Sequence, residues 1–203
     1  MLTSEVIIAF ITGVVGPLIL LLARYILAHR NKHKDPIKES AKAGTVVVKK
    51  LEEIQEYVGS DRIWITQFHN GGHFYPTGKS IQKYSMVYEL VSQYATSIRH
   101  NFQNIPINLF SRSINHLLEE DYIAIKDFQD HAEPTYGLRY IAGETGVKSC
   151  YMFALKSIES KMIGVLSIEF VKNKAEISHE DLEQLHVYAG QIGVLIDTYL
   201  KSK

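Results

Sequence analysis

Residues 147–155 read VKSCYMFAL and residues 162–170 read MIGVLSIEF. Both stretches are rich in apolar, aromatic and β-branched residues, a composition typical of buried strands. The segment between them, KSIESK (156–161), is short and mostly polar, as expected of a turn. We therefore expect two adjacent antiparallel strands, and this pair decides how the rest of the sequence is interpreted.

The sequence around this pair alternates between strand and helix signals. Two further strands are expected at RIWITQF (62–68) and IQKYSMVYEL (81–90), joined by a glycine-containing turn at 69–80. A helix at 108–120, a strand at 122–127 and a short helix within 134–146 come next.

A closing helix is expected from Ser178 onward. Its apolar stripe has helical spacing and consists of Leu182, Leu185, Ala189, Ile192, Ile196 and Tyr199. The order of the elements predicts an α+β domain, in which an antiparallel sheet carries its terminal helices on one face.

An amphipathic connecting helix is expected at 37–60, after Pro36 and with a stop signal at Gly59. A heptad pattern runs along it, made by Ile37, Gly44, Leu51 and Val58 with Ala41, Val48 and Gln55 between them. Because Gly44 and Gln55 weaken this seam, we favour a helix that packs on its own domain and on a second copy. A homodimer through helices 37–58 and 178–201 is therefore expected.

Residues 1–28 form a candidate transmembrane helix. Val6 to Ala23 reads VIIAFITGVVGPLILLLA without a charged residue, and such a run can cross a hydrocarbon core of about 30 Å. The alternatives are a buried core helix and a cleaved signal peptide. A signal peptide carries its basic residues before the apolar run, whereas Glu5 precedes this one. The sequence favours a retained span, with the lipid bilayer as its partner.

Basic residues follow the span and predict its orientation. Arg24, Arg30, Lys32 and Lys34 lie on its C-terminal side, and positive residues remain cytoplasmic. The formal net charge of zero hides this layout, since residues 24–50 carry 8 basic and 2 acidic side chains and residues 51–203 carry 14 and 19. We expect a single-pass protein of the inner (plasma) membrane, with a basic juxtamembrane linker at 29–36 and a cytoplasmic domain at 61–203.

The strand pair, the closing helix HEDLEQLHVYAGQIGVLID (179–197) and the leading hairpin together resemble the GAF family of small-molecule-sensing domains. The resemblance implies a GAF/PAS-like antiparallel sheet with flanking helices, dimers through the terminal helices, and a ligand between the sheet and the crossing loops. It implies a pocket lined by Phe68, Tyr84, Met86, Tyr136, Arg139 and Tyr151. The family's cyclic-nucleotide signature, a chromophore-bearing cysteine pattern and an attached kinase or cyclase are all missing from the sequence.

A second family is similar in outline. A single N-terminal span followed by a globular domain resembles the holins of T-even phages, and SCYMFALKSIESKMIGVLSIEF (149–170) is similar to their C-terminal strand, strand, helix run. In that family the globular domain is periplasmic, whereas the basic flank here predicts a cytoplasmic one. A holin-like lysis protein with a regulatory domain is therefore the alternative.

The stretch FHNGGHF (68–74) is a separate candidate binding site. The two glycines would let a ligand approach the backbone while His69, Asn70 and His73 bind it. The alternative is a hairpin with two surface histidines. We expect no metal site, since the other histidines supply no third ligand at a suitable spacing.

Other chemistry is largely excluded. Cys150 is the only cysteine, which excludes an internal disulfide. It is either a nucleophile paired with His69 or His73, or a buried thiol, and its apolar strand favours the thiol. The sequence has no Walker loop, Rossmann fingerprint, nucleophile elbow or zinc-protease motif, and no basic excess for nucleic acid.

The sequence thus predicts a membrane-anchored sensory or regulatory protein that binds a small ligand or a protein partner. We do not expect an enzyme, and the sequence identifies no cofactor.

Overall fold

The computed structural model describes residues 3–31 and 35–201. The chain forms two compact units, Met1–Lys42 and Ala43–Ser202, and each is described by itself. The first unit is helical, with α1 (Ser4–Phe10), the π-helical turn η1 (Ile11–Val15), α2 (Gly16–Asn31) and the first residues of α3 (Pro36–Val58). The π-helical turn comes just before Pro17, which has no amide hydrogen to donate to the helix.

Among the described residues, Ile8–Leu27 is the helical stretch that is long and apolar enough to cross a membrane. The basic linker expected at 29–36 is not a separate segment at its start, because α2 continues through Asn31. Lys32 and Lys34 lie outside the described residues.

The second unit is built on a six-stranded sheet in the order β3-β2-β1-β6-β5-β4. Every neighbouring pair is antiparallel. The strands are β1 (Arg62–His73), β2 (Ser80–Val91), β3 (Ile105–Pro106), β4 (Tyr122–Ile125), β5 (Ser149–Lys156) and β6 (Met162–Phe170). The predicted hairpin of β5 and β6 is confirmed and lies inside the sheet, with β1 on the other side of β6.

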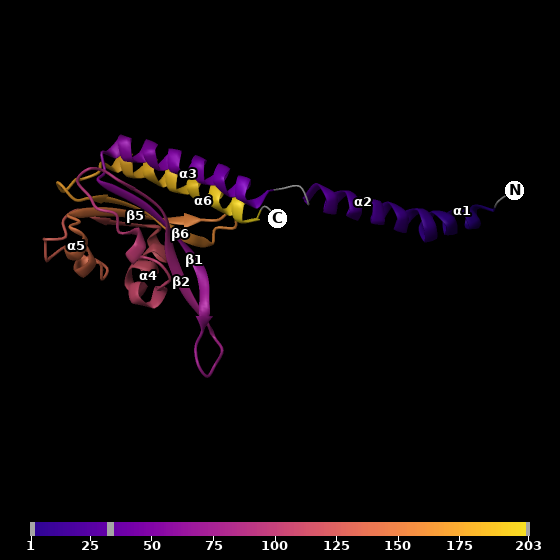
Figure 1. Ribbon diagram of the computed structural model, residues 1–203, viewed down its shortest axis with the longest axis horizontal. Helices are drawn as coiled ribbons and strands as arrows, with labels where there is room; N and C mark the ends of the chain where they lie inside the picture. The colour runs from indigo at the N-terminus through magenta and orange to yellow at the C-terminus, as the bar shows by residue number, and fades with distance from the viewer. Residues whose placement is uncertain (1–2, 32–34, 202–203) are drawn as a thin grey trace. The chain divides into compact units, whose positions relative to one another are not determined.

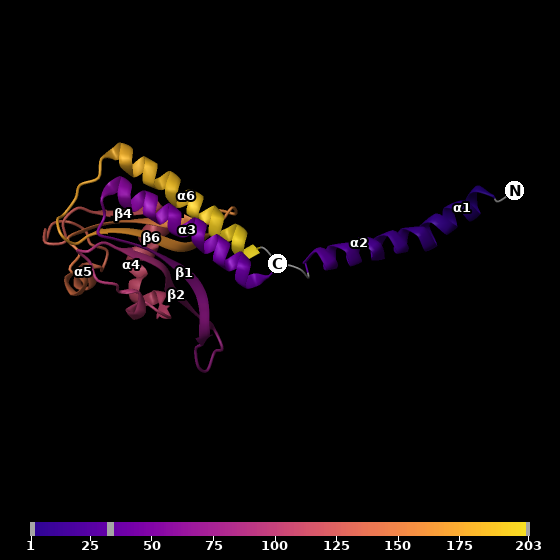
Figure 2. The ribbon, with the colours of Figure 1, turned by 45° about the horizontal axis from the view of Figure 1, so that its top comes forward.

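Helices cover both faces of this sheet (Figures 1 and 2). On one face α3 and α6 (His179–Lys201) lie side by side, while α4 (Ser111–Glu120) and α5 (Arg139–Thr145) cover the other. Side chains alternate between the faces along each strand. Ile63, Leu166 and Phe153 therefore pack under α3 and α6, whereas Trp64 and Met152 join the second core under α4 and α5. The predicted α+β fold, with its terminal helices on one face, is confirmed.

The sheet-facing stripe of α3 differs from the predicted heptad pattern. Val47, Leu51 and Ile54 are buried, and Val58 packs beside them. Ile37, in contrast, is exposed. A straight helix that packs on a sheet follows the 3.6-residue period rather than a heptad, so the buried residues recur at spacings of four and three. Most of α3 is therefore part of the domain core.

The leading hairpin is longer than its sequence indicates. HNGGH (69–73) was expected in a turn but belongs to β1, and its pairing with β2 continues to His73 and Ser80. Gly71 explains part of this, because a Cβ atom there would lie 2.3 Å from Cδ of Lys83. The missing side chain leaves room for the lysine stem across the hairpin. The turn is therefore confined to residues 74–79.

Smaller elements also refine the sequence prediction. The helix expected at 108–120 begins as the 3₁₀ turn η3 (Ile107–Phe110) and becomes α4 at Ser111. α5 lies within the expected range and ends at Gly146, whose φ of 73° is left-handed. Ser178 caps α6 as expected, since its Oγ accepts a hydrogen bond of 3.1 Å from the amide of Asp181. The short strand β3 and the 3₁₀ turn η2 (Arg99–Asn101) were not predicted.

Candidate functional site

A cavity of ≈60 Å³ lies between the sheet and the α4–α5 layer. The strands contribute residues from the sheet face opposite α3 and α6, and the helices close the cavity from the other side. Its wall includes Trp64, Thr66, Phe68, Tyr84, Cys150, Met152, Val165 and Glu169 from strands, and Ser113, Ile114, Leu117, Ile141, Ala142 and Thr145 from helices. Most of these side chains are apolar, so the cavity suits an apolar molecule.

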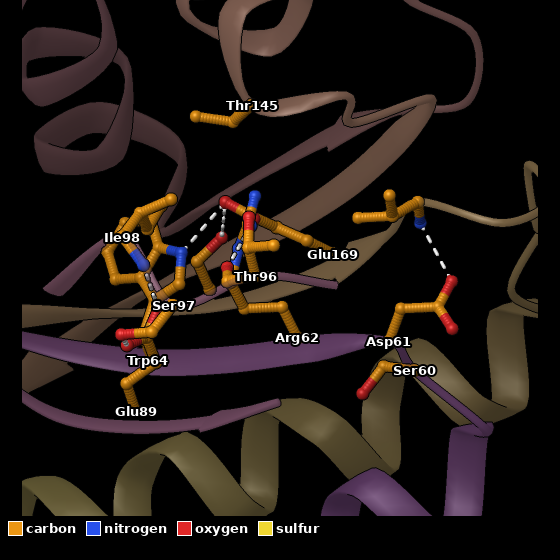
Figure 3. A network of polar contacts seen from close by, with 12 residues as sticks. Ser60, Asp61, Arg62, Trp64, Glu89, Thr96, Ser97, Ile98, Thr145 and Glu169 are labelled. Atoms are coloured by element: carbon orange, nitrogen blue, oxygen red, sulfur yellow. Dashed lines mark hydrogen bonds and ion pairs between the residues drawn. The ribbon is translucent and has the colours of Figure 1, made fainter. Parts of the chain in front are cut away.

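Glu169 is the acidic side chain in this wall, and it is held by two strong hydrogen bonds. Its Oε1 accepts one from the Trp64 indole at 2.7 Å, and its Oε2 accepts one from Nε of Arg62 at 2.6 Å. Arg62 also donates from Nη1 to the carbonyl of Thr96 at 3.0 Å. Figure 3 shows these side chains gathered around the carboxylate, with Thr145 on the helix side of the network.

The network contains a fully buried arginine with spare hydrogen-bonding capacity. Arg62 has no exposed surface, and its Nη2 is buried without a partner among the described residues. Buried donors are normally satisfied by protein, water or ligand. The Nη2 group of Arg62 is therefore a free hydrogen-bond donor close to Glu169, which lines the cavity.

Burial raises the pKa of both the carboxyl group and the thiol in the cavity wall. It raises the pKa of Glu169 above its usual range, although Arg62 and Trp64 act in the opposite direction. Burial also raises the pKa of the Cys150 thiol, and the nearby Glu169 carboxylate adds to the effect. Cys150 is therefore a protonated thiol at neutral pH, as its apolar strand predicted, and not an activated nucleophile.

A sequence model of the GAF domain matches residues 47–196, more than half of the chain. The chain belongs to the GAF family. Solved structures with the same fold confirm the architecture of this GAF domain. The comparison with curated protein sequences returns no significant match. These comparisons give the phage-holin resemblance no support.

The chain is similar to a far-red cyanobacteriochrome photoreceptor at 13% identity and a TM-score of 0.61, over 89% of this chain and 98% of that one. A far-red-absorbing protein with bound biliverdin IXα is 15% identical, with a TM-score of 0.56 over 73% and 85% of the two chains. A domain of a sensor histidine kinase protein from Sinorhizobium meliloti 1021 is also 15% identical, with a TM-score of 0.51 over 73% and 87%. At these identities the likeness establishes the fold.

The residues predicted for the GAF pocket lie in different places. Phe68 and Tyr84 line the cavity, and Tyr84 packs against Phe110 with ring centroids 5.6 Å apart. Burial raises the pKa of Tyr84, so its hydroxyl stays protonated. Met86 is buried in the same core without lining the cavity, and Tyr136 packs beside that core. That these side chains bind a ligand stays a prediction.

Arg139 and Tyr151 have structural partners instead. Arg139 donates to the backbone carbonyls of Phe128, Asp130 and Glu133, and so holds the loop before α5. Tyr151 lies on the sheet face under α3 and α6, where its hydroxyl donates to Ala175 at 3.0 Å. Strand alternation explains this, because Cys150 and Met152 take the cavity face on either side of it.

The second predicted group lies away from the cavity. His69, Asn70 and His73 are in the part of β1 that extends past the rest of the sheet, and His69 Nε2 is 2.9 Å from the Ser85 hydroxyl. None of the three is in the cavity wall. Within residues 3–31 and 35–201, no three His, Cys, Asp or Glu side chains are grouped to hold a metal ion.

The sequence prediction missed the Glu169 network. One signal was available, since MIGVLSIEF places Ser167 and Glu169 two residues apart within an otherwise apolar strand. Such a pattern puts both polar side chains on one face of a buried strand. A carboxylate there requires buried donors, which Arg62 and Trp64 supply from the neighbouring strand β1.

Proposed function

We propose that this chain is a membrane-anchored GAF sensory or regulatory protein, whose cavity binds a small, largely apolar molecule without catalysis. The observation that carries the proposal is the apolar cavity with one hydrogen-bonded carboxylate in its wall. The free Nη2 donor of Arg62 beside that carboxylate favours a ligand with a single polar group.

The size of the cavity limits the ligand. Sites for drug-sized molecules measure roughly 300–1,000 Å³, whereas this cavity measures ≈60 Å³. We therefore expect a molecule of few heavy atoms, or a larger one that α4 and α5 admit by moving apart. A biliverdin like that of the far-red-absorbing relative requires the second route.

Binding in the cavity has a structural route to α3. Glu169 holds Arg62 at the start of β1, only a few residues after α3 ends at Val58. The preceding residue, Asp61, accepts hydrogen bonds of 2.8 Å from the amides of Val171 and Lys172, just after β6. A ligand that shifts Glu169 would therefore also displace the short segment that connects α3 to β1.

The output surface that we propose is the pair of helices α3 and α6. They carry a shallow groove lined by Lys50, Val187, Gly190, Gln191, Val194 and Leu195. Val187 and Val194 are 52% and 44% exposed, and an apolar helix face of this kind is typical of a subunit interface. We propose a second copy of the chain as the partner of this groove. Val187→Glu with Val194→Glu should then convert a dimer in detergent to a monomer.

The anchor that we propose is the helix from Ile8 to Leu27. From Ile8 to Ala23 this helix carries no charged side chain, and a single helix cannot bury such an apolar surface by itself. Lipid satisfies this requirement, and the basic side chain of Arg24 in the last turn of this helix favours a cytoplasmic GAF domain. A topology reporter fused after Lys203 tests this orientation, and a periplasmic signal would contradict it.

The binding proposal is tested with two small probes and the full chain in nanodiscs. Phenol and toluene have the same number of heavy atoms, but phenol alone has a hydroxyl for Glu169 and Arg62. We expect phenol at ten times its dissociation constant to stabilise the domain by about 1.4 kcal/mol, a rise in melting temperature of about 3–6 °C. Toluene at the same concentration as phenol should give a smaller rise in melting temperature.

Two matched variants locate the binding. Ala142→Leu places a larger side chain in the cavity wall and should abolish the phenol shift. Ala132→Leu makes the same change at an exposed position and should retain it. An equal phenol shift in both variants would contradict binding in this cavity.

A further inference from the structure

The hairpin of β1 and β2 forms an arm that extends beyond the other strands (Figures 1 and 2). Pairing between β1 and β6 ends at Gln67 and Gly164, whereas pairing between β1 and β2 continues to His73 and Ser80. Residues 68–83 therefore form a ribbon that β6 does not flank. Because a two-stranded hairpin is only marginally stable in water, an arm of this kind is suited to contact another surface.

The tip of the arm exposes two adjacent aromatic side chains. Phe74 is 50% exposed and Tyr75 is 98% exposed. The backbone of the turn is internally bonded, with the Phe74 amide donating to Lys79 and the Gly78 amide donating to Phe74, both at 2.8 Å. The tip can therefore enter a less polar environment without leaving these backbone groups unpaired.

The charges of the arm differ from those of the domain. Residues 62–88 contain no aspartate or glutamate, and Lys79 and Lys83 lie within the arm. Residues 51–203 as a whole carry 14 basic and 19 acidic side chains. Positive charge beside exposed aromatic rings matches the interface of an anionic membrane, where lysine meets headgroups and aromatic rings lie at their level.

We propose that the β1–β2 arm docks on the anionic headgroup region of the membrane through Phe74, Tyr75, Lys79 and Lys83. This inference rests on the proposed anchor, which joins the domain to a bilayer through the few residues between α2 and α3. A tether of this kind gives a local concentration in the millimolar range. Millimolar affinity is therefore enough to keep the arm on the surface. Docking fixes how the GAF domain faces the membrane.

The test uses the full chain in nanodiscs, with a nitroxide on Thr77→Cys in a Cys150→Ala background. Thr77 lies in the turn, so Phe74 and Tyr75 are retained. Power-saturation spectroscopy measures whether the label is exposed to water or to lipid. A label on Asn173→Cys, in the exposed loop after β6, is the matched control.

We expect the Thr77 label to be shielded from the aqueous relaxant in nanodiscs with phosphatidylglycerol and exposed in pure phosphatidylcholine, while the Asn173 label stays exposed in both. Phe74→Ser with Tyr75→Ser should abolish the shielding. Lys79→Gln with Lys83→Gln should weaken docking roughly 30-fold, since each lysine near an anionic surface is worth somewhat less than a factor of ten.

A Thr77 label as exposed as the Asn173 label in anionic nanodiscs would overturn the proposal, and so would equal shielding in both lipids. Extraction with alkaline carbonate tests the anchor separately. A chain that resists extraction but has an exposed tip contradicts the arm alone. A chain that is extracted but has a shielded tip in anionic nanodiscs contradicts the anchor alone.

Discussion

Replacing Arg62 with methionine tests the buried pair of Arg62 and Glu169. The substitution removes the 2.6 Å bond from Nε to Glu169 and the 3.0 Å bond from Nη1 to Thr96. It leaves the Glu169 carboxylate in a buried site with the Trp64 indole as its strong donor. Because breaking a buried pair leaves a charge without its partner, we expect a loss of about 3–5 kcal/mol in unfolding free energy at pH 8.

The same variant should depend on pH in a defined direction. Burial already raises the pKa of Glu169 above its reference value of 4.5, and losing Arg62 removes the main opposing charge. A carboxylate whose pKa is higher in the folded state favours folding at low pH and loses that contribution as pH rises through the folded value. Each unit of upward shift corresponds to about 1.36 kcal/mol. At pH 5 the loss should therefore fall to about 1–2 kcal/mol, the value of the missing hydrogen bonds.

Urea unfolding of the full chain in non-ionic micelles measures this loss. Trp64 is the only tryptophan and lies in the network, so its fluorescence reports the unfolding of the GAF domain. With a slope of about 2 kcal/mol/M, the midpoint should fall by about 1.5–2.5 M at pH 8. Arg99→Met replaces an exposed arginine and should change stability by less than about 0.5 kcal/mol. Equal losses at pH 5 and pH 8 would refute the reasoning.

Three further variants test the packing and the network. Gly164→Ala should cost more than about 3 kcal/mol in urea unfolding, because its Cβ would lie 2.0 Å from a carbonyl oxygen of β1, and a loss below 1 kcal/mol would contradict this. Gly193→Ala should cost about 1–3 kcal/mol, because its Cβ would lie 2.3 Å from the carbonyl of the last β5 residue; hydrogen exchange should show α6 loosening first. Arg62→Met with Glu169→Leu should recover most of the stability lost in the single variant, and a double variant no more stable than the single one would argue against an unpaired charge as the cause.

Much of the fold follows from patterns within single elements. The apolar composition of β5 and β6 and the short segment between them predict the hairpin, and the spacing of apolar residues in α6 predicts the face that it buries. The length of β1 could not be read in the same way. HNGGH carries turn residues, yet Gly71 lets the Lys83 stem cross the ribbon. That reason lies in the partner strand, which a local pattern does not reveal.

The candidate site was predicted less completely, for a related reason. Phe68 and Tyr84 were expected in the pocket and line the cavity. Tyr151 was expected there too, but the alternation of β5 turns it toward α3 and α6. Arg62, Trp64 and Glu169 form their network through the register of β1 on β6. Register is set by the whole sheet, so the sequence shows these residues only as a charge or a ring in an apolar strand.

A buried ion pair is a poor way to stabilise a domain, and this bears on why Arg62 and Glu169 are present. Apolar residues of similar volume are often as stable as a buried pair or more so. Here Glu169 forms part of the cavity wall, and Arg62 directly follows Asp61, which holds the segment after β6 to the start of β1. We infer that its value is coupling rather than stability. The double variant separates the two with toluene, which needs neither polar side chain to bind. The variant should stay folded and yet no longer transmit toluene binding to hydrogen exchange in α3.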